Sequence, residues 1–127
     1  MPNALIVDDS KVMRDMIIAC LRPLAGLSPT EATSGLDAIE QLSLQRFDLL
    51  VLDLNMPDIG GLEVIEFVRA QDKLRELPIL VVTTRDDQNS RTRILSAGAS
   101  QYLTKPFTPA EILSAVQGLL PDGKATG

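Results

Sequence analysis

Three short, continuous runs of apolar residues constrain the fold of this chain more than any other feature. They occupy residues 4–7 (ALIV), 49–52 (LLVL) and 79–82 (ILVV). Runs of this length without polar alternation are typical of parallel strands buried on both faces of a sheet. A weaker run at 101–104 (QYLT) is interpreted as a further strand. The pattern therefore predicts a parallel sheet that is covered by helices on both sides.

The segments between these runs have apolar residues at helical spacing, with Ser10 and Thr108 as predicted N-caps. The remaining strand must lie between residues 27 and 33, and Pro29 places it at a sheet edge, because proline cannot donate a ladder hydrogen bond. Five strands then alternate with five helices in a doubly wound α/β fold. The predicted helix faces contain, in chain order, Val12, Met13, Met16, Ile17, Cys20, Leu21 and Leu24; Leu36, Ile39 and Leu42; Leu62, Ile65 and Val68; Ile94, Leu95 and Gly98; and Ile112, Leu113, Val116, Leu119 and Leu120.

Composition narrows the function classes. The 127 residues fit one domain, predicted over 1–120, with 121–127 as a tail or the start of a linker. A net charge of −5 argues against direct nucleic-acid binding. No apolar run is long enough for a membrane span, no signal peptide is expected, and a single cysteine, Cys20, suits a cytoplasmic protein. The chain has no histidine, so its chemistry must depend on carboxylates, hydroxyls and lysine.

Polar residues recur at the predicted carboxyl ends of the buried strands. Asp8 and Asp9 follow the first strand, Asp53 follows the third, Thr83 the fourth and Lys105 the fifth. These ends share one edge of a parallel sheet, where open α/β folds bind ligands. Each residue alone is more often a cap, a turn residue or a solvated charge, but their joint placement favours a site.

The chemistry of this set points to phosphoryl transfer. Three carboxylates in one crevice repel one another unless a cation lies among them. Lys105 offers one, and Mg²⁺ offers another, since it accepts a few carboxylates and leaves room for phosphate oxygens. Phosphoryl transfer depends mainly on such positioning and charge neutralisation. Asp53, at the end of a central strand, is the predicted nucleophile.

The ordered motifs resemble the CheY-type receiver family of two-component signalling. The resemblance extends from residue 3 to about residue 120 and implies a flavodoxin-like sheet in the order 2-1-3-4-5. That order agrees with an edge position for the strand containing Pro29. The motifs are Asp8-Asp9-Ser10, Asp53-Leu-Asn-Met-Pro57 with Gly60-Gly61, Thr83-Thr84, Ala97-Gly-Ala99 and Lys105-Pro106-Phe107.

The resemblance implies a role for each acidic residue. Asp53 would be the phosphoacceptor. Asp9, Asp53 and the backbone carbonyl of Asn55 would bind Mg²⁺ directly, and Asp8 would act mainly through a metal-bound water. Lys105 would pair with a phosphoryl oxygen.

The resemblance also implies a switch rather than an enzyme, although such a domain supports its own phosphorylation and dephosphorylation. Thr83 would turn toward the phosphoryl group, Tyr102 would move between outward and inward rotamers, and the Lys105–Pro106 peptide would be cis. Thr84 departs from the alanine or glycine that is common in the family. Together with Asn55 and Arg85, it is expected to tune the lifetime of the phosphoryl group.

Partners follow from the same reasoning. Because the chain has no histidine, the donor would be a phosphohistidine on a sensor histidine kinase or phosphotransfer protein. An effector would bind the surface formed by the fourth helix, fifth strand and fifth helix. A stand-alone chemotaxis or phosphorelay protein and an excised receiver of a larger regulator fit equally well.

Three other functions remain as alternatives. A phosphate- or flavin-binding module would need an uncharged or basic first loop, where this chain has Asp8-Asp9. A haloacid-dehalogenase-type phosphatase would need two aspartates separated by one residue. A degenerate receiver that only binds partners would lack part of the acidic set.

Overall fold

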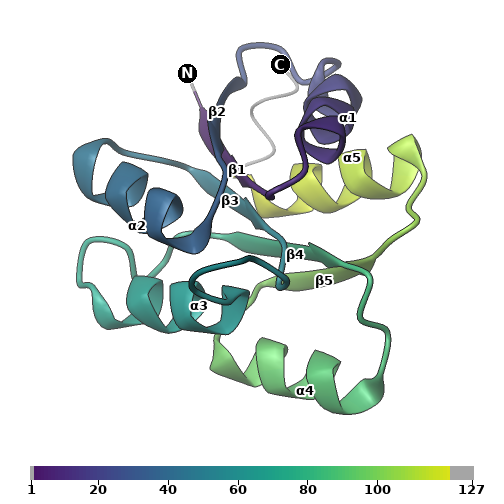
Figure 1. Ribbon diagram of the computed structural model, residues 1–127. Helices are drawn as coiled ribbons and strands as arrows, with labels where there is room; N and C mark the ends of the chain where they lie inside the picture. Colours follow the sequence, from purple (N-terminus) through teal and green to yellow (C-terminus); the bar gives the residue numbers. More distant parts are fainter. Residues whose placement is uncertain (1, 121–127) are drawn as a thin grey trace.

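The predicted sheet topology is confirmed. The computed structural model describes residues 2–120, so the predicted tail at 121–127 lies outside the described residues. Five parallel strands form one sheet in the order β2-β1-β3-β4-β5, as Figure 1 shows. The elements are β1 (Asn3–Val7), α1 (Lys11–Leu21), β2 (Ser28–Ala32), α2 (Gly35–Leu44), β3 (Leu49–Leu52), α3 (Gly61–Ala70), β4 (Ile79–Thr83), α4 (Gln88–Ala97), β5 (Gln101–Thr104) and α5 (Pro109–Leu119).

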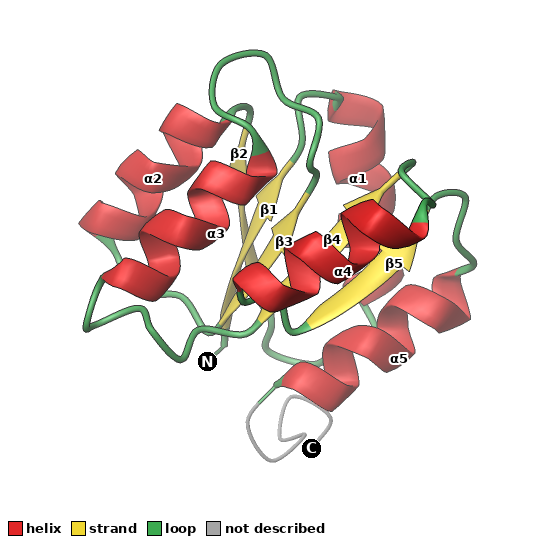
Figure 2. Cartoon of the chain, turned by 90° about the horizontal axis from the view of Figure 1, so that it is seen from below, coloured by secondary structure: helices red, strands yellow, loops and turns green. Residues whose placement is uncertain are grey.

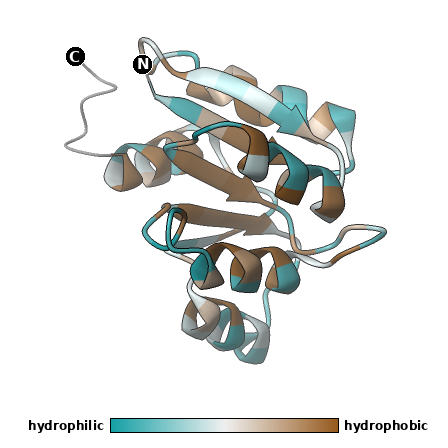
Figure 3. Cartoon of the chain, turned by 90° about the vertical axis from the view of Figure 1, so that its left-hand side faces the viewer, coloured by the Kyte–Doolittle hydropathy of each residue, from teal (hydrophilic) through white to brown (hydrophobic). Residues whose placement is uncertain are grey.

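Helices cover both faces of the sheet, which explains why the central strands are continuously apolar. Leu50 and Leu52 pack on one face with residues of α2, α3 and α4, whereas Leu49 and Val51 pack on the other with residues of α1 and α5. Figure 2 shows α2, α3 and α4 together in front of the sheet, and Figure 3 shows the hydrophobic central strands between the helix layers. Every residue of β3 and β4 is buried. Within residues 2–120, no helix has the length and apolar character to span a membrane.

Strand β2 lies at the edge of the sheet, as Pro29 predicted. In the part of the chain that the structure describes, it pairs only with β1, where Pro29 lies opposite Ala4. Four of its five residues are at least partly exposed. An edge position tolerates the missing N–H of Pro29 because only one side of the strand must hydrogen-bond.

Two predicted caps fix the starts of α1 and α5. The Ser10 hydroxyl accepts a hydrogen bond from the Met13 N–H at the start of α1, at 3.2 Å. Thr108 and Glu111 form a capping box at the start of α5. Both caps satisfy N–H groups that a helix leaves unpaired at its first turn.

The predicted apolar helix faces are too wide. Val12, Met16 and Leu36 were assigned to them, yet they are 73%, 46% and 55% exposed, and Leu95 is 39% exposed. A helix advances about 100° per residue, so Val12 and Met16 project from one flank of α1, whereas Ile17 projects toward the sheet. A sheet covers only a strip of each helix, and residues at the margin of the apolar arc remain in solvent.

Candidate functional site

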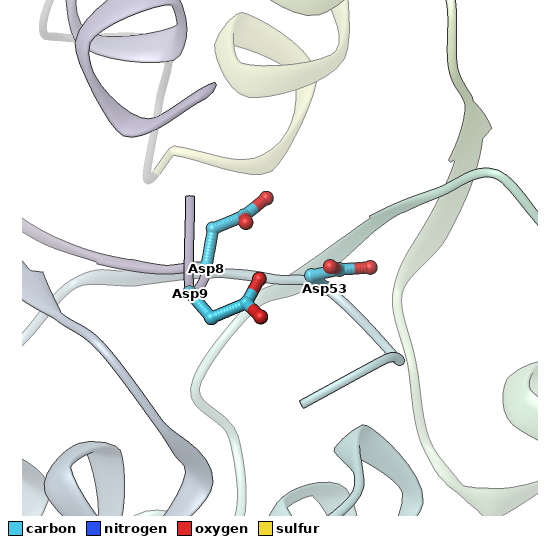
Figure 4. Close-up of side chains that lie close together, drawn as sticks. All are labelled: Asp8, Asp9 and Asp53. Atoms are coloured by element: carbon cyan, nitrogen blue, oxygen red, sulfur yellow. The ribbon is translucent and has the colours of Figure 1, made fainter. Parts of the chain in front are cut away.

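The carboxyl ends of β1 and β3 bring three aspartates together. The two strands are neighbours, with Val7 opposite Leu52, so the residues that follow them emerge side by side. The Asp53 N–H donates to the Val7 carbonyl at 3.0 Å and fixes this junction. One carboxylate oxygen from each of Asp8, Asp9 and Asp53 lies within 4.8 Å of the other two, and Figure 4 shows the side chains grouped at this edge. Asp8 and Asp53 are buried, whereas Asp9 is exposed.

Lys105 places its ammonium group against this cluster. Its backbone N–H donates to the Thr83 carbonyl at 2.8 Å, which ties the loop after β5 to β4. Its Nζ lies 3.0 Å from Asp8 Oδ2 and 3.7 Å from Asp53 Oδ2, with the lysine side chain 13% exposed. Because these ion pairs are largely shielded from water, solvent and salt screen them less than they screen surface pairs.

The site has a deficit of positive charge. Burial raises the pKa of Asp53 above its ordinary value, and the neighbouring Asp8 raises it further. The Lys105 ammonium and the N–H of Asn55 act in the opposite direction, but burial has the larger effect on the pKa. One ammonium cannot balance three carboxylates. An all-oxygen donor set of this kind and spacing fits a hard divalent cation.

The Asn55 backbone lies beside the Asp53 carboxylate, since the Asn55 N–H contacts Asp53 Oδ1 at 3.3 Å. The same loop is tied to α2 through Asp58, whose carboxylate accepts hydrogen bonds from the N–H groups of Gly35 and Leu36. The N–H of Ile59 contributes most to holding the pKa of Asp58 below its ordinary value, and the N–H groups of Leu36 and Gly35 lower this pKa further. The loop that follows Asp53 is therefore anchored at both its start and its middle.

Thr83 and Tyr102 lie outside the acidic cluster but are linked to each other through Arg85. Thr83 is fully buried, and its Oγ1 accepts a hydrogen bond from the Arg85 N–H at 3.3 Å. The Tyr102 hydroxyl donates to the Arg85 carbonyl at 2.7 Å, and the tyrosine is 6% exposed. Tyr102 therefore occupies the inward position. The Lys105–Pro106 peptide is cis, as the family resemblance implied.

Arg14 belongs to the surroundings of the site, and the sequence reasoning missed it. It is 8% exposed, donates to the Asp8 carbonyl at 2.7 Å and pairs with Glu31 of β2 at 2.8 Å. Its position between Met13 and Ile17, on the side of α1 that faces the sheet, was a detectable signal. A charged residue in a buried helix face requires partners, and the adjacent acidic loop supplies one.

Comparison with known proteins agrees with this geometry. A family model described as "Response regulator receiver domain" matches residues 4–117. The chain is 39% identical to the chemotaxis protein CheY of Pseudomonas aeruginosa over 109 residues, covering 86% of this chain and 87% of the relative. It superposes on chemotaxis response regulator CheY4 of Vibrio cholerae with a TM-score of 0.87 and 33% identity, covering 94% of this chain and 99% of that one.

One structural neighbour bears on the metal. The response regulator Rcp1 was solved in a Mn²⁺-bound form, and the chain superposes on it with a TM-score of 0.81 at 26% identity, covering 93% of this chain and 91% of that one. A divalent ion in that protein is in keeping with the acidic cluster seen here.

Proposed function

The chain belongs to the family of response regulator receiver domains, and from this premise we propose that it accepts a phosphoryl group on Asp53 and switches a partner-binding surface. Receiver domains act in two-component signalling, bind a divalent metal ion and are not classical enzymes. The observation that carries the proposal is the convergence of three carboxylates and one ammonium group at the ends of the strands. We place the receiver at residues 1–120.

In the proposed transfer, a carboxylate oxygen of Asp53 attacks the phosphorus atom of a phosphohistidine on the donor protein. A new O–P bond forms as the N–P bond breaks, and the nitrogen keeps the electron pair of that bond. We assign this role to Asp53 because it follows β3, the middle strand of the sheet, with Lys105 3.7 Å from its Oδ2. The Lys105 ammonium would neutralise charge on the phosphoryl oxygens, which is the main requirement of this reaction.

We propose Mg²⁺ as the physiological ion. Asp9, Asp53 and the backbone carbonyl of Asn55 would hold it directly, and Asp8 would hold it mainly through water. The ion would supply charge neutralisation that the single lysine cannot provide. Exposure of Asp9 leaves the site open on one side, which would allow the donor to approach.

The output is proposed to run through Thr83 and Tyr102. Phosphorylation adds about 1.5 to 2 negative charges and three strong acceptor oxygens. The Thr83 hydroxyl would turn toward these oxygens, and its contact with the Arg85 N–H would be lost. Because the Tyr102 hydroxyl donates a hydrogen bond to Arg85, the movement of Thr83 would reach the surface formed by α4, β5 and α5. An effector would bind at this surface. We propose that the chain acts in the cytoplasm and that its phosphoryl donor is a sensor histidine kinase or a phosphotransfer protein.

The proposal is tested by mass spectrometry of the intact protein after incubation with Mg²⁺ and acetyl phosphate. We expect the wild-type chain to gain one phosphoryl group and Asp53→Asn to gain none. Asp48→Asn is the matched control, since Asp48 lies just before β3, at the opposite end of the strand from Asp53, and should leave the adduct unchanged. The proposal would be contradicted if the wild-type protein gained no phosphoryl group or if Asp53→Asn gained one.

A further inference from the structure

An arginine of α4 lies over the ring of the inward tyrosine. The guanidinium carbon of Arg91 is 5.1 Å from the centre of the Tyr102 ring. Its terminal nitrogen also makes a long contact of 3.5 Å with the Tyr102 carbonyl. A guanidinium at this distance from an aromatic face is within the range of a cation–π interaction.

Helix α4 has few other means of attachment on this side of the sheet. It is the most polar of the helices, and Ile94 is its only buried residue. Among the described residues, no carboxylate lies within ion-pair distance of Arg91. The ring of Tyr102 is therefore the main partner of this guanidinium, and a simple surface salt bridge does not account for its position.

The Tyr102 ring is thus held from two sides. Its hydroxyl donates to the Arg85 carbonyl, and Arg91 covers its face. Only the first contact is connected to Thr83, because the Arg85 N–H donates to the threonine hydroxyl. A movement of Thr83 would disturb the hydroxyl end of the ring and leave the contact with Arg91 in place.

We propose that Arg91 is a positioning residue that holds Tyr102 inward and so sets the ratio of inward to outward rotamers at the output surface. This inference rests on the proposed function in one respect, namely that Tyr102 takes part in the switch. A cation–π contact at a partly exposed position is strong enough to change a two-state ratio about two- to five-fold. Loss of Arg91 would accordingly shift Tyr102 toward solvent by that factor.

The composition of the chain makes this measurable without a label. Tyr102 is the only tyrosine, and there is no tryptophan, so intrinsic fluorescence reports on this ring alone. Quenching by acrylamide, which is neutral, measures how far the ring is exposed. We expect Arg91→Gln to raise the quenching constant relative to wild type and Arg91→Lys to give an intermediate value. Arg93→Gln, which removes an equal charge from an exposed site on the same helix, should match wild type.

Equal quenching in Arg91→Gln and wild type, or an equal rise in Arg93→Gln, would overturn the proposal. A second measurement needs no variant: in the NMR spectrum of the wild-type chain, ring current from Tyr102 should move the side-chain protons of Arg91 upfield of those of Arg93. Undisplaced Arg91 signals would also overturn it, even if Arg91→Gln fails to fold.

Failure of this inference is distinguishable from failure of the proposed function. Arg91 lies outside the acidic cluster, so Arg91→Gln should still accept a phosphoryl group on Asp53. If the wild-type chain gained no phosphoryl group, the receiver function would fail, but the comparison of Arg91→Gln with Arg93→Gln would still decide whether Arg91 holds the ring.

Discussion

Single side chains in this molecule are held by opposing demands of charge and burial. Asp8 and Asp53 are 2% and 7% exposed, although carboxylates are rarely buried without partners. Lys105 faces both of them, and Arg14 holds the backbone at Asp8 from the other side. Burying charged groups costs free energy, and such costs are usual at functional positions.

The role of Lys105 in this balance predicts a pH effect. Burial already raises the pKa of Asp53, and Lys105 opposes that rise, so Lys105→Met should raise the pKa further. A carboxyl whose pKa is higher in the folded than in the unfolded state favours folding when it is protonated. Stability contributed by Asp53 is therefore lost as the pH rises through its folded-state pKa, and this loss should be larger in Lys105→Met.

The measurement is a carbon-detected NMR titration of Asp53 in metal-free buffer, together with urea unfolding across the same pH range. Lys11→Met is a suitable control, because the Lys11 side chain is 72% exposed and, within residues 2–120, forms an ion pair only with Asp15 on the surface of α1. An unchanged titration of Asp53 in Lys105→Met would show that the ammonium does not control the site.

At the scale of whole elements, the strands were easier to predict than the helix faces. Burial on both faces leaves β1, β3 and β4 with apolar runs that few other structures produce, and Pro29 identified the edge strand. Helix faces such as that of Val12 were overestimated, because periodicity gives the direction of an apolar arc but not the width that the sheet covers. The partners of Arg14 and Asp58 depend on loops from other elements, and no local pattern specifies them.

Substitution by alanine is expected to have opposite effects at two glycines, one at the junction between α2 and the loop after β3 and the other in α5. A Cβ at Gly35 would overlap the Ile59 carbonyl oxygen, so Gly35→Ala must displace backbone of the loop after β3 that contains Asn55. We expect a loss of about 1–3 kcal/mol in the free energy of unfolding. A Cβ at Gly118, in α5, would meet nothing closer than 4.0 Å, and Gly118→Ala should add about 0.5–1 kcal/mol.

Urea unfolding of the two variants, compared with wild type at one pH, measures both effects. Because both substitutions add the same methyl group, differences between them report on the surroundings of each glycine. A stabilising Gly35→Ala would show that the loop after β3 is free to move away from α2.

At the scale of the whole molecule, the parallel sheet itself assembles the site. Residues separated by 97 positions, Lys105 and Asp8, come within 3.0 Å because their strands end at the same edge. This is why the sequence could indicate the acidic cluster before any contact was known: the topology followed from the apolar runs, and the topology places the strand ends together. The rotamer of Tyr102 and its cover by Arg91 depend on how α4 packs, which the polar sequence of that helix does not reveal.

The same assembly predicts that a divalent ion stabilises the entire fold. Asp8, Asp9 and Asp53 come together only in the folded chain, so Mg²⁺ should bind the native state and not the unfolded one. Binding to the native state alone then adds about 2.7 kcal/mol to the free energy of unfolding at a free Mg²⁺ concentration 100 times the dissociation constant.

The variant Asp9→Ala tests whether the ion acts at this site. The rise in thermal midpoint should be absent in Asp9→Ala, and its metal-free stability should stay near wild type because Asp9 is exposed. Differential scanning calorimetry with NaCl at matched ionic strength separates this effect from general screening of the net charge of −5. An equal rise in Asp9→Ala would mean that the ion acts elsewhere on the surface.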